Sequence, residues 1–299
     1  MTLRHFLSLD DLGADGIKRV IDNAIALKKK PPRKPPLARH TLAMVFEKAS
    51  TRTRVSFEAG MAQLGGHAIF LSPADTQIGR GEAVEDTARV LSRMADAVMI
   101  RNHSHEVLEQ FARHSRAPVI NGLTDRLHPC QLLADLQTYT EQRGDIAGAT
   151  VAWIGDGNNM CHSYLNAARL LGFDLRIATP PGYGPDTRLL DAAGERATLC
   201  EDAAQAADNA DLVVTDVWAS MGDDSDRETR LADFANYQVN KALMSWANAD
   251  ALFMHCLPAH RGEEVSAEVI DGPQSVVWDE AENRLHAQKA LLLDLLDSD

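Results

Sequence analysis

The sequence has no apolar run that approaches the ~18 residues of a membrane-spanning helix. Its first segment, MTLRHFLSLDDLGADG, contains acids and no long apolar core, so we expect no secretory signal there. Cysteine is also scarce: four residues, at positions 130, 161, 200 and 256, form no CxxC pair. Neither a zinc site nor a disulfide framework is indicated, and we expect a cytoplasmic protein with reduced thiols.

Positive charge is outnumbered by negative charge. Lysine and arginine total 30 against 43 acids, and the formal net charge of -13 argues against nucleic acid as a partner. The basic tract KKKPPRKPP, residues 28–36, contains four prolines and no aromatic residue. We interpret it as a stiff, solvated loop, with a nucleic-acid or heparin patch as the alternative. An anionic small molecule remains compatible with the charge balance, because binding depends on the local field.

What is present is an alternation of short apolar runs and helical patterns over 299 residues, enough for two ordinary domains. The runs TLAMVF, HAIFLS, DAVMIR and APVIN predict one series of strands, and a second series starts at ATVAWIGDG. Such alternation predicts the α/β class, with two parallel-sheet domains joined by long helices and a ligand site in the cleft between them. The expected boundaries are 1–135, 136–279 and a C-terminal helix at 280–299 that returns to the first domain.

Hydroxyl and arginine side chains crowd into ASTRTR, residues 49–54, after the first predicted strand. We expect a helix to start near Ser50, where unpartnered N–H groups and the helix dipole can hold an anion. Arg52 and Arg54 lie about 200° apart on a helix, so we assign Arg52 to the ligand and Arg54 to structural or interdomain pairing. An N-capped helix with solvated arginines is the alternative. The additional hydroxyl donors are those of Ser50, Thr51 and Thr53.

The longer segment FEKASTRTRVSFEAG resembles the carbamoyl-phosphate signature of the aspartate and ornithine carbamoyltransferases. DTARVLSRMADAVMIR, HPCQLLADL and TQIGRGEAVEDTARV agree with the same family. The resemblance implies that Arg101 is a second phosphate-binding arginine at a strand end. It also implies that Gln77 lies on a loop that reaches a neighbouring subunit's site. Some relatives have a lysine in that loop where this chain has Gly81, and Arg80 is the candidate to replace it.

His128 and Gln131 of HPCQLLADL have a physical case of their own. Three positions apart, they share one face of a predicted helix. Donors on that face can stabilise a carbamoyl oxygen as negative charge grows there, and the glutamine oxygen can accept from the carbamoyl amide. The alternative is an exposed histidine at a helix start, without a role.

Two polar segments in the second half follow predicted strands. In GDGNN, residues 155–159, two glycines fit a dinucleotide fingerprint, but Met160 stands where the third is needed. Asn158 and Asn159 instead offer amides for a substrate carboxylate or amine, or simply form a turn.

In DVWASMG, Asp216 can pair with an ammonium group, and Ser220 and Met221 can bind a carboxylate. The alternative for this segment is a flexible acidic loop, although loops that close on a substrate have the same composition.

Cys256 lies at a predicted strand end in HCLPAHRGEEV. A lone cysteine is usually inert in a core. We expect this one to lie near the attacking amine and to help it lose a proton, since carbamoyl transfer needs no covalent intermediate. His255 and His260 invite a metal interpretation, but the sequence shows no further clustered ligands.

DGNNMCHS, DVWASMG and HCLP together resemble the ornithine branch of the family, because aspartate enzymes lack the SMG and HCLP elements. The match spans essentially the whole chain. It implies that Cys256 and Leu257 lie at the reacting groups, that Arg284 of EAENR returns to the first domain's ligand, and that the Leu257–Pro258 bond is cis. The residues implied to contact ornithine are Asn159, Asp216, Ser220 and Met221.

The resemblance implies an enzyme that transfers a carbamoyl group from carbamoyl phosphate to the δ-amine of L-ornithine, giving L-citrulline in arginine metabolism. Residues 1–135 would bind carbamoyl phosphate, and residues 136–279, which are Rossmann-like, would bind ornithine. The catalytic residues would be Arg101, His128 and Cys256. The carbamoyl-phosphate ligands would be Ser50, Thr51, Arg52, Thr53, Gln77, Arg101, His128, Gln131, Cys256, Leu257 and Arg284.

No metal or organic cofactor is expected, and neither nucleic acid nor membrane is an expected partner. The implied assembly is a homotrimer that shares sites between subunits. Three alternatives stay open: a related enzyme that uses N-acetylornithine or putrescine, an NAD-dependent oxidoreductase, and a non-catalytic binding protein of the same fold.

Overall fold

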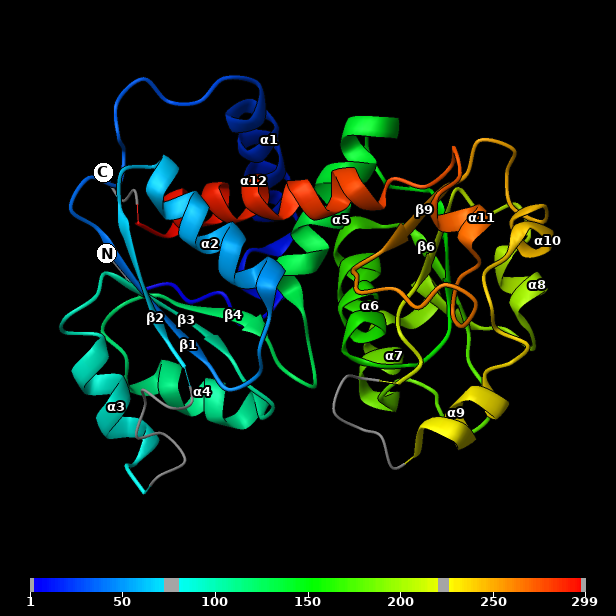
Figure 1. Ribbon diagram of the computed structural model, residues 1–299, viewed down its shortest axis with the longest axis horizontal. Helices are drawn as coiled ribbons and strands as arrows, with labels where there is room; N and C mark the ends of the chain where they lie inside the picture. Colours follow the sequence, from blue (N-terminus) through cyan, green and yellow to red (C-terminus); the bar gives the residue numbers. More distant parts are fainter. Residues whose placement is uncertain (1–2, 73–80, 220–225, 297–299) are drawn as a thin grey trace. The chain divides into compact units, whose positions relative to one another are not determined.

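A computed structural model describes residues 3–72, 81–219 and 226–296 (Figure 1). The chain divides into two compact units, one formed by Met1–Gln137 with Glu282–Asp299 and the other by Thr138–Ala281. Each unit contains one sheet whose paired strands are all parallel, which confirms the predicted α/β class. Within the described ranges, no helix combines the length and apolar character needed to cross a membrane.

The first unit is built on a four-stranded sheet in the order β2-β1-β3-β4. Its strands are β1 (Thr41–Phe46), β2 (His67–Leu71), β3 (Ala97–Arg101) and β4 (Val119–Leu123). Its helices are η1 (Leu9–Asp11), α1 (Gly13–Lys29), α2 (Thr51–Gln63), α3 (Val84–Leu91) and α4 (His105–His114), with parts of α5 (Pro129–Arg143) and α12 (Val277–Leu296).

Helices cover both faces of this sheet (Figure 1). On one face, Ala88 of α3 and Phe111 of α4 share an apolar cluster with Val45 and Ile100 of the strands. Helices α2 and α12 pack together on the other side, where a Cβ added at Gly60 would lie 3.3 Å from Lys289 Cγ. Strands β1 and β3 are buried along almost their whole length, which explains why the sequence shows continuous apolar runs there rather than alternation.

The second unit has a five-stranded sheet in the order β7-β6-β5-β8-β9. Its strands are β5 (Thr150–Ile154), β6 (Asp174–Ala178), β7 (Ala197–Leu199), β8 (Leu212–Thr215) and β9 (Leu252–His255). Its helices are α6 (Asn159–Leu171), α7 (Thr187–Ala193), η2 (Gly194–Arg196), α8 (Ala203–Ala207), α9 (Arg227–Asp233), α10 (Lys241–Met244) and α11 (Ala267–Ile270).

Alternate residues of β5 face opposite layers of this unit, as the strand geometry requires. Ala152 and Ile154 join a buried cluster with residues of α8, α10 and α11. Trp153 points to the other layer, where its ring centroid lies 5.7 Å from that of Tyr164 in α6.

The strand order of each sheet reverses once near its middle. The reversal lies between β1 and β3 in the first unit and between β5 and β8 in the second. Open α/β sheets bind ligands at the carboxyl ends of the strands at such a reversal. The topology therefore points to Arg52 and Arg101 in the first unit, and to residues 155–159 and Asp216 in the second.

Candidate functional site

Helix α2 begins directly after Ser50, as the sequence predicts. Ser50 is extended (φ −159°, ψ 114°), and its hydroxyl accepts a hydrogen bond from the Thr53 N–H at 3.3 Å. Arg54 is held within the first unit: its Nε pairs with Glu58 Oε1 at 2.9 Å, and its guanidinium lies 3.7 Å from the ring centroid of Phe70. The start of α2 thus has the capped geometry that leaves an anion-binding terminus.

Three arginines act on His128 in the first unit. Arg52 comes from the first turn of α2, Arg101 from the end of β3, and Arg284 from α12. His128 is only 5% exposed. Burial, and then the charges of these arginines, hold the pKa of His128 well below its usual value. The imidazole is therefore neutral at pH 7 and can donate one N–H without adding charge.

Arg284 connects α12 to α2 and to α5. Its Nη1 donates to Gln131 Oε1 at 2.6 Å, and its Nη2 donates to Thr53 Oγ1 at 3.1 Å. Gln131 Nε2 donates in turn to Asp135 Oδ1 at 2.9 Å. The amide of Gln131 is thus oriented from both ends.

Arginine forks, a helix N-terminus and hydroxyls are the donors that recognise phosphate. The first unit gathers all three kinds around Thr53 and His128, in a chain that is acidic as a whole. This cluster suits a small anion that also carries a carbonyl group, since the neutral His128 can donate to its oxygen.

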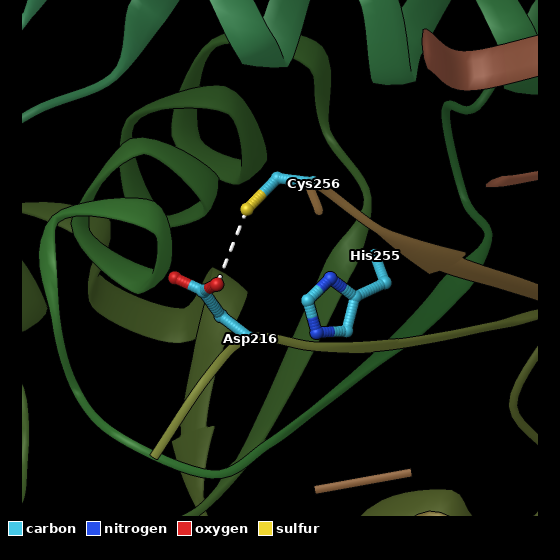
Figure 2. Close-up of side chains that lie close together, drawn as sticks. All are labelled: Asp216, His255 and Cys256. Carbon is cyan, nitrogen blue, oxygen red and sulfur yellow. Dashed lines mark hydrogen bonds between the residues drawn. The ribbon is translucent and has the colours of Figure 1, made fainter. Parts of the chain in front are cut away.

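In the second unit, Asp216 lies at the end of β8 and is 7% exposed. Its Oδ2 accepts from Asn158 Nδ2 at 2.8 Å. Its Oδ1 accepts from the Val217 N–H at 2.8 Å and from the Cys256 thiol at 3.2 Å (Figure 2). None of these three donors is a cation. The buried carboxylate of Asp216 therefore accepts three hydrogen bonds, and none of them comes from a positively charged group. Such a group suits an ammonium ligand.

Asn158 is used by the protein itself. Its Oδ1 accepts from the N–H groups of Met160 at 2.9 Å and Cys161 at 3.3 Å, which caps α6, while its Nδ2 binds Asp216. Asn159 is the first residue of the helix. The amide of Asn158 is thus engaged at both its oxygen and its nitrogen.

The turn that carries these residues requires glycine. Gly155 has φ +134°, which L side chains rarely adopt. A Cβ added at Gly157 would lie 2.3 Å from Pro185 N and 2.7 Å from Tyr183 O. The backbone of this turn therefore packs directly against the backbone of residues 183–185, which fixes the position of the turn.

His255, which precedes Cys256 in the chain, forms a fully buried pair with Glu264. His255 Nδ1 accepts from the Leu257 N–H at 2.9 Å, and because a backbone N–H can only donate, the ring hydrogen is on Nε2. Nε2 donates to Glu264 Oε1 at 3.1 Å. Burial raises the pKa of Glu264, but hydrogen bonds from His255 and from the His260 N–H outweigh it, so the pKa is lowered overall.

The loop after β9 is shaped by this pair. Leu257 has φ +57°, an uncommon conformation for a leucine, and its N–H is anchored to His255. The Leu257–Pro258 peptide bond is cis, as predicted. The sequence offered no reason to pair His255 with Glu264, nine positions later, because the partnership depends on how the loop folds back.

Two groups among the described residues bring metal-ligand atoms within 4.8 Å of one another. In the group of Asp216, His255 and Cys256, both ring nitrogens of His255 already bind protein atoms. A metal would have to displace one of those bonds. The other group comprises His260, Glu263 and Glu264, so carboxylates do lie near the two histidines although the sequence pattern did not show them.

The structure assembles the predicted site residues as two groups. Gln77, Arg80, Ser220 and Met221 lie outside the described residues. Thr51 is exposed in the first turn of α2, and Leu257 is partly exposed. The group in the first unit comprises Ser50, Thr51, Arg52, Thr53, Arg101, His128, Gln131 and Arg284. The group in the second unit comprises Asn159, Asp216, Cys256 and Leu257.

Two family models match the chain. Residues 4–141 match one described as the carbamoyl-P binding domain of aspartate/ornithine carbamoyltransferase, and residues 147–295 match its Asp/Orn binding domain. Among similar sequences, an ornithine carbamoyltransferase of Methylococcus capsulatus is 66% identical, covering 99% of both chains. One of Nitrosococcus oceani is 65% identical, covering 99% of this chain and 98% of that protein.

Solved structures of similarly named proteins have the same fold. The ornithine carbamoyltransferase of Burkholderia thailandensis E264 superposes with a TM-score of 0.92 at 54% identity, covering 98% of this chain and 99% of that one. The enzyme of Pyrococcus furiosus gives a TM-score of 0.95 at 48% identity, covering 99% and 98%.

Proposed function

The chain belongs to the aspartate/ornithine carbamoyltransferase family, and from this premise we propose that it transfers the carbamoyl group of carbamoyl phosphate to the δ-amine of L-ornithine. The products are L-citrulline and phosphate. The observation that carries the proposal is the group of arginines around the neutral His128 at the start of α2. It offers donors for a phosphate and for a carbonyl oxygen in one place.

In this proposal, the first unit binds carbamoyl phosphate. The phosphate is held by Arg52 and the first N–H groups of α2, with hydroxyls from Ser50, Thr51 and Thr53. Arg101 and His128 donate to the carbamoyl oxygen, whose charge grows in the tetrahedral transition state. Arg284 orients Gln131, whose oxygen accepts from the carbamoyl amide, and Gln77 of a neighbouring subunit completes the site.

The second unit binds the amino acid. Asp216 receives the side-chain ammonium, and Asn159, Ser220 and Met221 hold the other end. An amine of lysine type has a pKa near 10.4, so its neutral form at pH 7 costs about 4–5 kcal/mol. A carboxylate beside an ammonium stabilises the charged form, so Asp216 helps here by accepting the proton, and the thiol of Cys256 donates a hydrogen bond to that carboxylate.

In the reaction, the neutral amine attacks the carbonyl carbon, and a C–N bond forms. The ammonium has by then given one proton to the carboxylate of Asp216, to which the Cys256 thiol donates, and the attacking nitrogen loses its second proton to the departing phosphate. The bond from carbon to the phosphate oxygen then breaks, and phosphate leaves with the electron pair while Arg52 and the helix terminus stabilise its charge. Leu257 lies beside Cys256 at the reacting groups.

We also propose a homotrimer in the cytoplasm, with a role in arginine metabolism. The support is the resemblance of the TQIG segment to an intersubunit loop, together with four free cysteines, which are typical of a reducing compartment. Light scattering of the purified chain should give three times the monomer mass of 32.7 kDa, and a monomer at micromolar concentration would contradict the shared site.

The substrate is tested by incubating the enzyme with carbamoyl phosphate and ornithine, N-acetylornithine or putrescine, and measuring ureido product and phosphate release. Ornithine should be the preferred amine by a wide margin, because putrescine has no carboxylate to bind, and the acetyl group of N-acetylornithine adds bulk and removes the α-ammonium charge. Faster turnover of putrescine or N-acetylornithine would overturn the assigned substrate. Tight binding of carbamoyl phosphate without turnover of any amine would support the non-catalytic alternative.

A further inference from the structure

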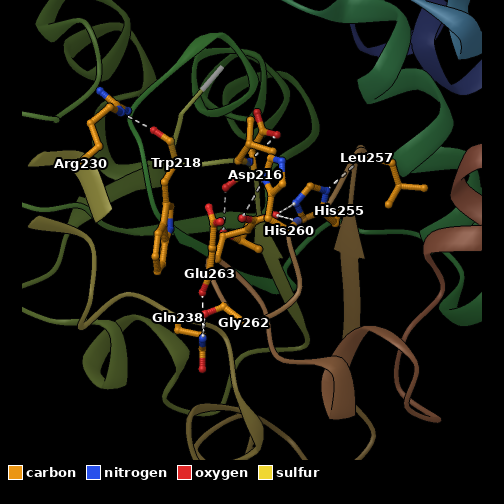
Figure 3. A network of polar contacts seen from close by, with 12 residues as sticks. Asp216, Trp218, Arg230, Gln238, His255, Leu257, His260, Gly262 and Glu263 are labelled. Atoms are coloured by element: carbon orange, nitrogen blue, oxygen red, sulfur yellow. Dashed lines mark hydrogen bonds and ion pairs between the residues drawn. The ribbon is translucent and has the colours of Figure 1, made fainter. Parts of the chain in front are cut away.

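Two bridges tie the turn after β5 to the segment after β8. One is the hydrogen bond from Asn158 to Asp216, at 2.8 Å. The other runs through Arg230 of α9. Its two partners, Asp156 and Trp218, each lie two positions along the chain from a residue of the first bridge. Arg230 Nη2 binds Asp156 Oδ2. Its Nε donates to the backbone oxygen of Trp218 (Figure 3). A single guanidinium thus holds both segments that carry the proposed amine-binding groups.

Aromatic rings fix the orientation of this guanidinium. Its carbon lies 4.7 Å from the ring centroid of Tyr183 and 5.1 Å from that of Phe234. Tyr183 is itself tied to the same turn, because its backbone oxygen accepts from the Gly157 N–H at 2.8 Å. A planar fork that stacks and donates in two directions is specific to arginine, and a lysine could reach only one of the two acceptors.

Arg230 also neutralises one of two neighbouring carboxylates, those of Asp156 and Asp216. Burial raises the pKa of Asp156 and the charge of nearby Asp216 adds to that effect, while Arg230 opposes it. Pairing with Arg230 neutralises Asp156. The donors that the structure gives to Asp216 are neutral, so its charge is not cancelled by them. A cationic ligand is then attracted to Asp216 and not to Asp156.

We propose that Arg230 is a positioning residue for the amine substrate. It sets the distance between the turn that carries Asn159 and the segment that carries Asp216, and it leaves Asp216 as the carboxylate that selects the ammonium. Arg230 acts through these groups and touches no reacting atom. This inference rests on the proposed function, since it assigns a determinant of affinity for the amine.

The test is steady-state kinetics of Arg230→Met and Arg230→Lys, with ornithine and carbamoyl phosphate varied in turn. Arg230→Met should raise the KM for ornithine at least tenfold, and the KM for carbamoyl phosphate should change less than twofold. Arg230→Lys should fall between Arg230→Met and wild type, because one of the two contacts is kept. Asp156→Asn should raise the ornithine KM in the same direction, which provides a second variant should Arg230→Met fold poorly.

Arg196→Met is the matched control, because Arg196 forms an exposed ion pair with Asp174 at 2.9 Å in the same unit. Its kinetic constants should equal those of wild type. An ornithine KM within threefold of wild type in folded Arg230→Met, or an equal rise for both substrates, would overturn the positioning role. Wild-type enzyme that fails to use ornithine would instead refute the proposed function, so the two failures are distinguishable.

Discussion

Replacing Asp216 by asparagine removes one charge at the amine site and hardly changes the volume of the side chain. The carboxylate accepts from Asn158, Val217 and Cys256. An amide has a single oxygen, so in Asp216→Asn one NH2 group must face a protein donor. Because only 7% of Asp216 is exposed, water cannot readily satisfy the donor that is left over.

The structure allows the cost to be divided into two parts. An unsatisfied buried donor lowers the free energy of unfolding by about 1–3 kcal/mol. Loss of the buried charge pair with an ammonium ligand costs a further ~2–5 kcal/mol of binding. At 1.36 kcal/mol per tenfold, the second part predicts a fall of roughly 30- to 5,000-fold in kcat/KM for ornithine. The affinity for carbamoyl phosphate, which we assign to the other unit, should be unchanged.

A reciprocal double variant separates charge from hydrogen bonding. In Asp216→Asn combined with Asn158→Asp, the amide at position 216 can donate to the carboxylate at position 158, so the bridge is restored with its direction reversed. A carboxylate is also a good N-cap, so α6 should keep its start. We therefore expect the double variant to regain stability in chemical denaturation without regaining ornithine turnover.

The assay is phosphate release at saturating carbamoyl phosphate, with calorimetry of carbamoyl phosphate alone as the control. A kcat/KM for ornithine within threefold of wild type in Asp216→Asn would refute the reasoning. So would full activity in the double variant, because the hydrogen bond rather than the position of the charge would then be what matters.

Further predictions concern the cysteines and His128. Cys256→Ser should impair the use of ornithine far more than calorimetric binding of carbamoyl phosphate, and equal losses would count against its role. Iodoacetamide at pH 8 should label the partly exposed Cys200 and Cys256, with both substrates protecting only Cys256 in peptide mass spectra. Cys130, whose pKa burial raises to about 12, and Cys161 should stay unlabelled. Because the pKa of His128 is lowered on folding, the unfolded state takes up more protons below about pH 6.5, and stability falls as pH falls. His128→Gln should remove part of the fall in unfolding free energy between pH 7.5 and 5.5, up to about 1.4 kcal/mol, in urea titrations. A fall as large as that of wild type would contradict the lowered pKa of His128.

The main strands could be predicted because buried parallel strands are continuous apolar runs. TLAMVF became β1 without a shift of either end, and the helix expected near Ser50 starts there. Strand β7 was missed because Ala197–Leu199 is short and partly exposed, with no apolar run to mark it. Helix α3 ends at Leu91, and the hydroxyl of its C-cap residue Ser92 donates to the Ala88 carbonyl at 2.6 Å.

The site could be predicted only where residues are near one another in the sequence. The STRTR and HPCQ segments each place several polar groups within a few positions, so spacing alone marked them as candidate site segments. The pairs His255 with Glu264 and Arg230 with Asp156 depend on loops folding back over many residues. That Asn158 caps α6 and also binds Asp216 likewise depends on the fold, and no spacing argument could separate Asn158 from Asn159.

The central claim is that the start of α2 binds the phosphate of carbamoyl phosphate through Arg52. Calorimetric titration of carbamoyl phosphate into Arg52→Ala tests it, with Arg54→Ala as the matched control two positions along the same helix. Arg54 is tied to Glu58 and Phe70, so its removal should leave the affinity within threefold of wild type. Arg52→Ala should weaken binding at least ~30-fold, which corresponds to ~2 kcal/mol for a lost buried charge contact. Wild-type affinity in Arg52→Ala, or an equal loss in Arg54→Ala, would contradict the account.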